Sequence, residues 1–345
     1  MTQSPDPAGS LLSLPPPDLP AATLSRLALD HWGIAGDLVP LTSERDLNHR
    51  LDSATGSFTL KLANAAEPAA LTDFQTRALL HVAATDPGLP TPRVLPDRDG
   101  RVIVDTPAGA LRLLTWLPGT PVARLPRSAA LARATGAALA RLTAALQDFT
   151  HPAADHCLLW DIRRFPLLAP LTGSLPDDLR AIVQEFDQRF HSQIGPALQG
   201  LPTQVVHADF NPHNLLADPA SPDRITGILD FGDMVRTPRV CDLAVAASYL
   251  VEADAPLALL SPLVAAYHAR LPLLPQEIAL LPDLITARML TTLTIATWRA
   301  ARYPENAAYI LRNAPSARAG LQAFRATDPR HLADSLMSAC ERPLA

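Results

Sequence analysis

The polar side chains that could do chemistry gather in one short part of the sequence. The segment Val206-His207-Ala208-Asp209-Phe210-Asn211-Pro212-His213-Asn214 is bracketed by apolar runs, and Leu229-Asp230-Phe231-Gly232-Asp233 follows soon after it. Charged, imidazole and amide side chains are costly to bury, so crowding of this kind is typical of a site rather than of a core. The apolar flanks predict that buried elements hold the cluster in place.

The spacing within the cluster is that of phosphoryl transfer. His207-x-Asp209-x4-Asn214, followed by Asp230-Phe231-Gly232, reproduces the patterns H-x-D-x4-N and D-F-G. A carboxylate must accept the proton of the attacking hydroxyl, and Asp209 fits the role of catalytic base. Mg²⁺ is a hard cation that prefers oxygen ligands, which Asn214 and Asp230 supply. A strand, a turn and a second strand between Asn214 and Asp230 would bring those two residues back together.

A single lysine stands out among the basic residues. The chain has 29 Lys and Arg in total, and Lys61 is the one lysine. In a chain whose other basic residues are all Arg, we expect Lys to remain where Arg cannot replace it. A phosphate contact that needs a compact point charge is such a position. Lys61 falls on the third predicted strand, where phosphotransferases of this type pair a lysine with nucleotide phosphates. We expect its orienting acid on the next helix, with Asp73 preferred and Gln75 as the alternative.

The sequence has no glycine-rich phosphate loop. No G-x-x-x-x-G-K-[ST] motif occurs, which excludes a Walker A nucleotide site, and no G-x-G-x-x-G separates the first strands. The corresponding loop reads Thr42-Ser43-Glu44-Arg45-Asp46-Leu47-Asn48. This argues against a protein Ser/Thr/Tyr kinase and for a relative with a different phosphate loop.

The secondary structure predicted to position these residues changes along the chain from mainly strands to mainly helices. Short apolar runs separated by turn residues predict an N-terminal set of strands with a preceding helix at 21–32 and one internal helix at 68–84. The strands are predicted at 37–41, 48–51, 57–62, 93–95, 101–104 and 110–117. Helical spacing then dominates, at 127–149, 176–198, 238–251, 256–270 and 275–302, with short strands at 204–206, 215–217 and 225–229.

These patterns predict an α+β protein of two lobes. The smaller lobe is an N-terminal antiparallel sheet with one helix, and the larger C-terminal lobe is mainly helical. We place a disordered Pro-rich tail at 1–20, a nucleotide-binding lobe at 21–117, and a lobe with the catalytic loop and substrate pocket at 118–345.

Composition limits the classes of partner and the compartment. The chain of 345 residues is 48% hydrophobic and has a net charge of −5, so we expect no nucleic-acid partner. Its 3 cysteines form no CxxC pair, which rules out a disulfide framework and a cysteine zinc site and indicates a reducing compartment. Residues 1–20 contain no Lys or Arg, and the apolar run at 243–251 is too short for a bilayer. We therefore expect a cytoplasmic protein without a membrane partner.

From about residue 36 onward, these motifs resemble the aminoglycoside phosphotransferase and choline kinase superfamily. The resemblance implies a protein-kinase-like fold and phosphorylation of small molecules. It matches Ser43 to Asn48 with the family's nucleotide loop, which makes Ser43 and Asn48 candidate nucleotide contacts. Leu113-Leu114-Thr115-Trp116-Leu117-Pro118-Gly119 matches the hinge whose backbone holds the base, which adds Leu114 and Trp116.

The same resemblance assigns roles around the catalytic loop. His207 corresponds to a histidine that supports the loop, Asp209 to the base, and Asn214 and Asp230 to the metal ligands. Asp242, in Cys-Asp-Leu-Ala, matches an aspartate that buttresses the loop. The cofactor implied is Mg²⁺, with ATP or GTP as the phosphoryl donor.

Within the superfamily, three stretches look most like hydroxylysine kinases. They are residues 159–168, 207–214 and 227–234, the last containing Asp-Phe-Gly-Asp-Met. The expected substrate is therefore a small hydroxylated amine or amino acid, with 5-hydroxylysine first and homoserine, choline or an aminoglycoside as alternatives. Outside this class, a metal hydrolase could use His207, Asp209 and His213 as ligands. An inactive relative acting as a binding module is the other alternative.

Overall fold

The computed structural model describes residues 17–43 and 45–342, and the chain divides into two compact units. Unit 1 runs to Pro118 and also contains His151–Cys157, whereas unit 2 contains Gly119–Thr150 and Leu158–Ala345. The predicted division into 21–117 and 118–345 does not anticipate that His151–Cys157 belongs with the N-terminal part. Of the tail predicted at 1–20, residues 1–16 lie outside the described residues.

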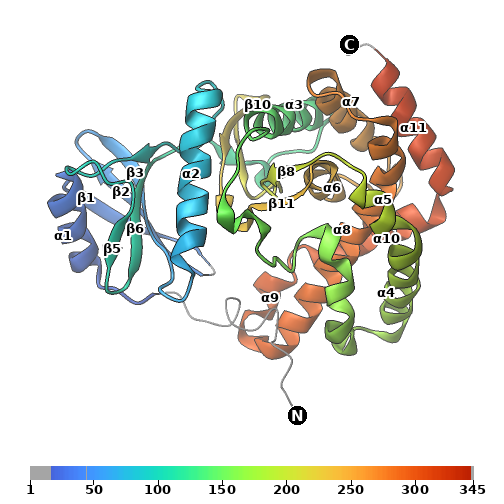
Figure 1. The fold of residues 1–345 in the computed structure, drawn as a ribbon, viewed down its shortest axis with the longest axis horizontal. Helices are drawn as coiled ribbons and strands as arrows, with labels where there is room; N and C mark the ends of the chain where they lie inside the picture. Colours follow the sequence, from blue (N-terminus) through green and yellow to red (C-terminus); the bar gives the residue numbers. More distant parts are fainter. Residues whose placement is uncertain (1–16, 44, 343–345) are drawn as a thin grey trace. The chain divides into compact units, whose positions relative to one another are not determined.

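Unit 1 is built around an antiparallel sheet with the strand order β1-β2-β3-β6-β4, in which β5 also pairs with β6. The strands are β1 (Gly36–Leu41), β2 (Leu47–Ser53), β3 (Gly56–Leu62), β4 (Val94–Leu95), β5 (Val104–Thr106) and β6 (Gly109–Thr115). Figure 1 shows the sheet between helix α1 (Ala21–Trp32) and helix α2 (Ala69–Thr85). The three strands predicted before residue 62 and the helix predicted at 68–84 are confirmed.

Side-chain alternation along β3 decides which residues face each helix. Leu60 and Leu62 join the buried cluster that contains Leu24 and Ala28 of α1. Lys61 therefore points to the opposite face of the sheet, which is the face covered by α2 (Figure 1). The hydrophobic core under α1 thus fixes the direction of the lysine side chain.

The segment His151–Cys157 packs against α2 within unit 1. The ring of His151 stacks on Phe74 with 5.2 Å between ring centroids, and its Nε2 lies 3.0 Å from Asp73 Oδ2. Phe74 is 1% exposed, so this short segment completes the burial of α2. The chain therefore passes between the two units at 118–119, at 150–151 and again at 157–158.

Unit 2 is mainly helical, as predicted. Its helices are α3 (Ala129–Ala145), α4 (Asp177–Arg189), α5 (Gly195–Gln199), α6 (Val240–Ser248), α7 (Leu260–Arg270), α8 (Pro275–Arg302), α9 (Ala307–Ile310), α10 (Ala314–Ala326) and α11 (Pro329–Glu341). The helix predicted at 176–198 is interrupted, because a π-helical turn at Phe190–Ile194 separates α4 from α5. The helices beyond residue 302 have no counterpart in the prediction.

Two small sheets in unit 2 hold the predicted catalytic motifs. One has the order β10-β9-β7 and the other pairs β11 with β8. Their strands are β7 (Thr120–Pro121), β8 (Thr203–Val206), β9 (Leu215–Asp218), β10 (Ser221–Ile228) and β11 (Val235–Pro238). The H-x-D-x4-N segment connects β8 to β9, and Asp-Phe-Gly connects β10 to β11. The strand pairs thus place both polar connections at the ends of paired strands.

Helix α8 forms much of the core of unit 2. An 18-residue window within it has a mean hydropathy of 1.4, enough by length and composition to cross a membrane, but 78% of that window is buried inside the structure. Its apolar side chains therefore pack against the rest of the unit. Glu277 caps its first turn by accepting a hydrogen bond from the Leu274 backbone N–H at 2.8 Å.

Candidate active site

The catalytic loop between β8 and β9 has an unusual backbone conformation. Ala208 has φ of 61°, in the left-handed region that residues with a Cβ rarely occupy. The Asp242 carboxylate, at the start of α6, accepts hydrogen bonds from the backbone N–H groups of His207 at 3.1 Å and Ala208 at 2.9 Å. Two charge-assisted hydrogen bonds, donated by the backbone to a buried carboxylate, compensate for the strained residue. Asp242 therefore fixes the start of the loop.

We expect Asp242→Asn to lower both stability and kcat. The amide has one acceptor oxygen in place of two, so a buried backbone N–H of the loop loses its partner, which costs about 1–3 kcal/mol. Thermal unfolding and steady-state kinetics measure the two effects. The matched control is Asp334→Asn, an exposed aspartate on α11 that should leave both unchanged. An Asp242→Asn protein with the melting temperature and kcat of the wild type would contradict this role.

His207 is a structural member of the site. Its side chain is fully buried, its Nε2 donates to the Leu229 carbonyl at 2.9 Å, and its Nδ1 accepts from the Asp209 backbone N–H at 3.3 Å. Its ring also meets Phe231 edge to face, with 4.9 Å between centroids. The imidazole thus joins the catalytic loop to the Asp-Phe-Gly connection, with both ring nitrogens in use.

Both carboxylate oxygens of Asp209 are held by other side chains. Asn214 Nδ2 donates to Oδ2 at 2.7 Å, and Arg288 Nη2 donates to Oδ1 at 3.1 Å. The Asp209 side chain is 23% exposed, whereas that of Arg288 is 3% exposed. Asp209 is therefore oriented by the protein and still reachable from solvent.

The charges around Asp209 act on its pKa in opposite directions. Burial raises the pKa of Asp209 to about 6, the Arg288 guanidinium opposes this shift, and the negative charges of Asp233 and Asp230 add to it. Two further aspartates and one arginine thus act electrostatically on the Asp209 carboxylate. A carboxylate with a raised pKa can accept a proton from a hydroxyl that approaches it.

The oxygen ligands expected for a metal ion lie side by side. The pairing of β9 with β10 brings Leu215 opposite Ile228, and the Leu229 N–H donates to the Asn214 carbonyl at 2.8 Å. Asp230 follows directly, as the connection predicted between the two residues requires. Asn214 donates through its amide nitrogen, which leaves its side-chain oxygen for a cation, and Asp230 is exposed. One amide oxygen and one carboxylate fit Mg²⁺, which usually takes few protein ligands beside phosphates and waters.

Lys61 pairs with a different acid from the one predicted. Lys61 Nζ lies 2.9 Å from Asp46 Oδ2, and both side chains are largely buried. Asp46 Oδ1 also accepts from the Asn64 backbone N–H at 3.4 Å. Although burial opposes ionisation, the charge and hydrogen bond of Lys61 lower the pKa of Asp46. The acid that pairs with Lys61 in this structure is therefore Asp46, and an orienting role for Asp73 or Gln75 stays a prediction.

The geometry of α2 and of the strands explains this correction. Asp73, whose side chain is 40% exposed, binds His151 and Arg77, whereas Gln75 Oε1 accepts from the buried Arg112 at 3.2 Å. In the β2–β3 hairpin Lys61 lies opposite Asn48, so Asp46 is its diagonal neighbour on the same face. The register of the hairpin, which follows from the turn at 53–56, would have indicated Asp46.

The other predicted nucleotide contacts lie in unit 1. Ser43 Oγ accepts from the Asp46 backbone N–H at 3.2 Å, and the side-chain oxygen of Asn48 is buried without a hydrogen-bond partner. Leu114 of β6 pairs with β3 on one side and β4 on the other. The backbone N–H of Trp116 donates to the Ser57 carbonyl at 3.3 Å. Among these four residues, Asn48 is the one whose buried side-chain oxygen lacks a hydrogen-bond donor.

The geometry does not support the metal-hydrolase alternative. His207 uses both ring nitrogens within the protein, and His213 Nε2 lies 3.3 Å from Asn313 Oδ1. Within residues 17–43 and 45–342, no group of three or more His, Cys, Asp or Glu side chains could hold a metal ion. Asp209 is bound to an amide and a guanidinium instead.

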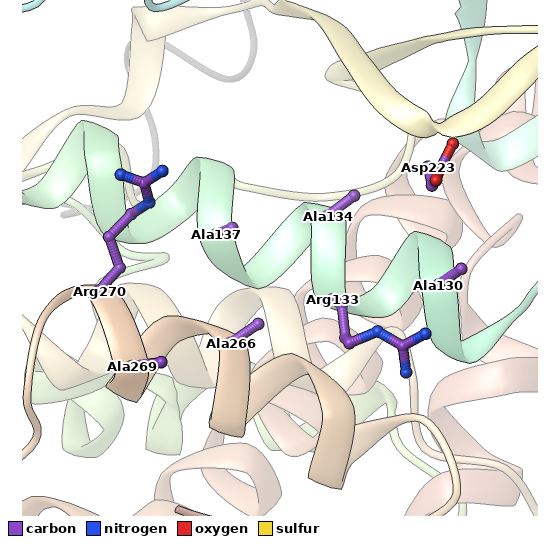
Figure 2. Close-up of a pocket in the computed structure, with 8 residues that line it drawn as sticks. All are labelled: Ala130, Arg133, Ala134, Ala137, Asp223, Ala266, Ala269 and Arg270. Carbon is purple, nitrogen blue, oxygen red and sulfur yellow. The ribbon is translucent and has the colours of Figure 1, made fainter. Parts of the chain in front are cut away.

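A surface hollow of about 660 Å³ between α3 and α7 is a separate feature (Figure 2). It contains none of the predicted site residues, and it is lined by Ala130, Arg133, Ala134, Ala137, Asp223, Ala266, Ala269 and Arg270. The two helices approach closely at Gly136, where an added Cβ would clash with the Leu263 carbonyl. The small alanine side chains beside that crossing account for the hollow.

Comparison with known proteins places this geometry in a family. The model of the phosphotransferase enzyme family matches residues 38–281. This range spans the lysine strand, the catalytic loop and the Asp-Phe-Gly connection. The chain belongs to this phosphotransferase family. The predicted superfamily and the predicted enzyme class, a small-molecule kinase with an alcohol group as acceptor, are thereby confirmed.

Relatives of this phosphotransferase cover most of its length. The hydroxylysine kinase of Danio rerio is 30% identical over 317 residues, which cover 86% of this chain and 88% of the relative. The hydroxylysine kinase of Mus musculus is 28% identical over 302 residues, with 79% and 80% covered. The sequence resemblance to this group therefore extends well beyond the catalytic motifs.

Solved structures share the fold of this phosphotransferase. An amicoumacin kinase in complex with AMP-PNP and Ca²⁺ has a TM-score of 0.69 at 16% identity, covering 91% of this chain and 97% of that chain. A microcompartment-associated aminopropanol kinase has a TM-score of 0.67 at 21% identity, covering 93% and 99%. The predicted protein-kinase-like α+β fold is confirmed.

Proposed function

We propose that this phosphotransferase transfers the γ-phosphoryl group of ATP or GTP to the hydroxyl of a small amine or amino acid, with 5-hydroxylysine as the first candidate. The observation that carries the reaction is the geometry of Asp209, which is held by Asn214 while remaining reachable from solvent. The acceptor class is supported by the hydroxylysine kinases, which match over 79–86% of the chain.

In the proposed reaction, Asp209 binds the acceptor hydroxyl and takes its proton as the oxygen attacks the γ-phosphorus, and the nucleoside diphosphate leaves. Asn214 and Asp230 would hold Mg²⁺ through their side-chain oxygens, and the ion supplies charge neutralisation on the phosphates. Lys61 binds nucleotide phosphates as a compact ammonium on a strand. Its pairing with Asp46 keeps the ammonium directed before the nucleotide arrives.

A panel of acceptors tests the proposal. The purified protein is incubated with MgATP or MgGTP and with 5-hydroxylysine, homoserine, choline or an aminoglycoside, and diphosphate release and product mass are measured. We expect the highest kcat/KM with 5-hydroxylysine. A preference for another acceptor would replace the substrate but leave the reaction class in place. Absence of nucleotide binding and of turnover would favour an inactive binding module.

A prediction for Lys61 arises from this role. Lys61→Arg should lower kcat/KM for the nucleotide about 10²-fold although the charge is kept, because a misplacement of about 1 Å costs that much in transfer geometry. The longer, planar guanidinium cannot replace the ammonium between Asp46 and phosphates. The matched control is the reverse exchange Arg77→Lys on the exposed side of α2, which should have no effect. A Lys61→Arg enzyme with wild-type kcat/KM would remove the phosphate role from Lys61.

A further inference from the structure

An arginine lies within the apolar core helix of unit 2. Arg288 is on α8, 2% exposed, and is followed by Met289, Leu290, Leu293 and Ile295 in the same buried helix. Burying a guanidinium is costly unless the charge is paired and its N–H groups are bonded. Nothing in the H-x-D-x4-N or Asp-Phe-Gly patterns indicates this residue, since it lies 79 positions beyond Asp209.

Contacts from separate segments hold the guanidinium in place. Arg288 Nη1 donates to the Trp160 carbonyl at 3.2 Å, and its guanidinium carbon lies 5.0 Å from the centroid of the Trp160 ring. Tyr249, just beyond α6, also interacts electrostatically with Arg288. A planar group held by a carbonyl and an aromatic face has little freedom to turn. The remaining Nη2 then points to Asp209 Oδ1 at 3.1 Å.

We propose that Arg288 is a positioning residue for the catalytic carboxylate. Asn214 holds Oδ2 and Arg288 holds Oδ1, so two donors from separate segments define the plane of the Asp209 carboxylate. A carboxylate held at one oxygen can rotate about its Cβ–Cγ bond, and the accepting lone pair then turns away from the hydroxyl. The inference rests on the proposed function, because it requires Asp209 to be the base.

Two other roles for Arg288 lead to different kinetics. An arginine that contacted the transferring phosphoryl group would contribute independently of Asp209, and its loss would multiply with the loss of the base. An arginine that bound an anionic group of the acceptor would mainly set the KM for the acceptor. A residue that acts through Asp209 contributes nothing further once Asp209 no longer accepts a proton.

A double-mutant cycle separates these roles. The enzymes are wild type, Arg288→Met, Asp209→Asn and the double variant, assayed with MgATP and 5-hydroxylysine. We expect Arg288→Met to lower kcat about 10²-fold, with both KM values changed less than about threefold, and the double variant to be no slower than Asp209→Asn alone. The matched control is Arg302→Met, an exposed arginine at the end of the same helix, which should retain wild-type kinetics.

Arg288→Lys keeps the measurement informative if Arg288→Met does not fold. An ammonium cannot reach the Trp160 carbonyl and Asp209 in the same fork geometry, so we expect about a tenfold loss in kcat that also disappears in the Asp209→Asn background. The positioning role would be overturned if the kcat losses of the Arg288 and Asp209 variants multiplied in the double variant. It would also be overturned if substitution of Arg288 raised the KM for the acceptor and left kcat unchanged. In both cases Asp209 would remain the base. An Asp209→Asn enzyme with full activity, or a wild type that turns over no acceptor, would instead reject the proposed function, and the inference would fall with it. Turnover of another acceptor would only change the acceptor used in the cycle.

Discussion

Asp209→Asn should bind nucleotide like the wild type and lose turnover about 10²–10⁴-fold, the usual contribution of a general base. The amide preserves the shape of the side chain and removes the proton acceptor. In this structure it also keeps an oxygen available for the hydrogen bonds from Asn214 or Arg288, so the loop should remain folded. Steady-state kinetics with the preferred acceptor, together with calorimetric titration of MgATP, measures both parts of the prediction.

The control for Asp209 uses a residue with the same chemistry in another place. Asp328→Asn alters an exposed aspartate that caps α11, and it should leave kcat unchanged. An Asp209→Asn enzyme that turned over at the wild-type rate would show that another group accepts the proton. A variant that lost nucleotide affinity as well would indicate that Asp209 also organises the nucleotide site.

Asp230→Ala should abolish Mg²⁺-dependent nucleotide binding. The substitution removes the charged oxygen ligand of the pair Asn214 and Asp230, and an amide oxygen alone holds a divalent cation poorly. Asp230 has φ of 57° and accepts from the Gly232 N–H at 3.2 Å, so the turn also loses its side-chain cap. Titration of ATP with and without Mg²⁺ measures the effect.

A matched alanine variant separates metal binding from damage to the sheet. Asp223→Ala removes an exposed aspartate from β10, the strand that leads to Asp230, and should leave the affinity for MgATP unchanged. Unchanged affinity in Asp230→Ala itself would reject the metal assignment. Thermal unfolding of both variants shows whether the turn at Asp230 contributes to stability.

The sequence predicted those parts of the fold and site that depend on local pattern. The alternation of Leu60, Lys61 and Leu62 is enough to identify a strand with a lysine on one face, and the apolar runs around Asn214 and Asp230 identify the strands that rejoin them. The catalytic loop follows a fixed spacing, so its residue types and the intervals between them are enough to identify it.

The parts that escaped prediction depend on register or on contacts between distant segments. Asp46 becomes the partner of Lys61 through hairpin pairing, although a search for an acid on the next helix leads to Asp73. Arg288 comes to Asp209 from a helix that reads as apolar core. The left-handed backbone of Ala208 was not predicted, although the family resemblance indicated Asp242 as the aspartate that supports this loop.

The segment His151–Cys157 bears on how this protein could be divided or recombined. A gene fragment ending at Pro118 would encode every strand of the first sheet, yet it would lack the imidazole that stacks on Phe74 and binds Asp73. The buried face of α2 would then be left open to water. Unit 1 is therefore formed by two separate segments of the sequence. Exchanging only the N-terminal segment between relatives would separate α2 from the residues that complete its buried face. A chimera would have to transfer the seven-residue segment as well, from within the sequence of the other unit.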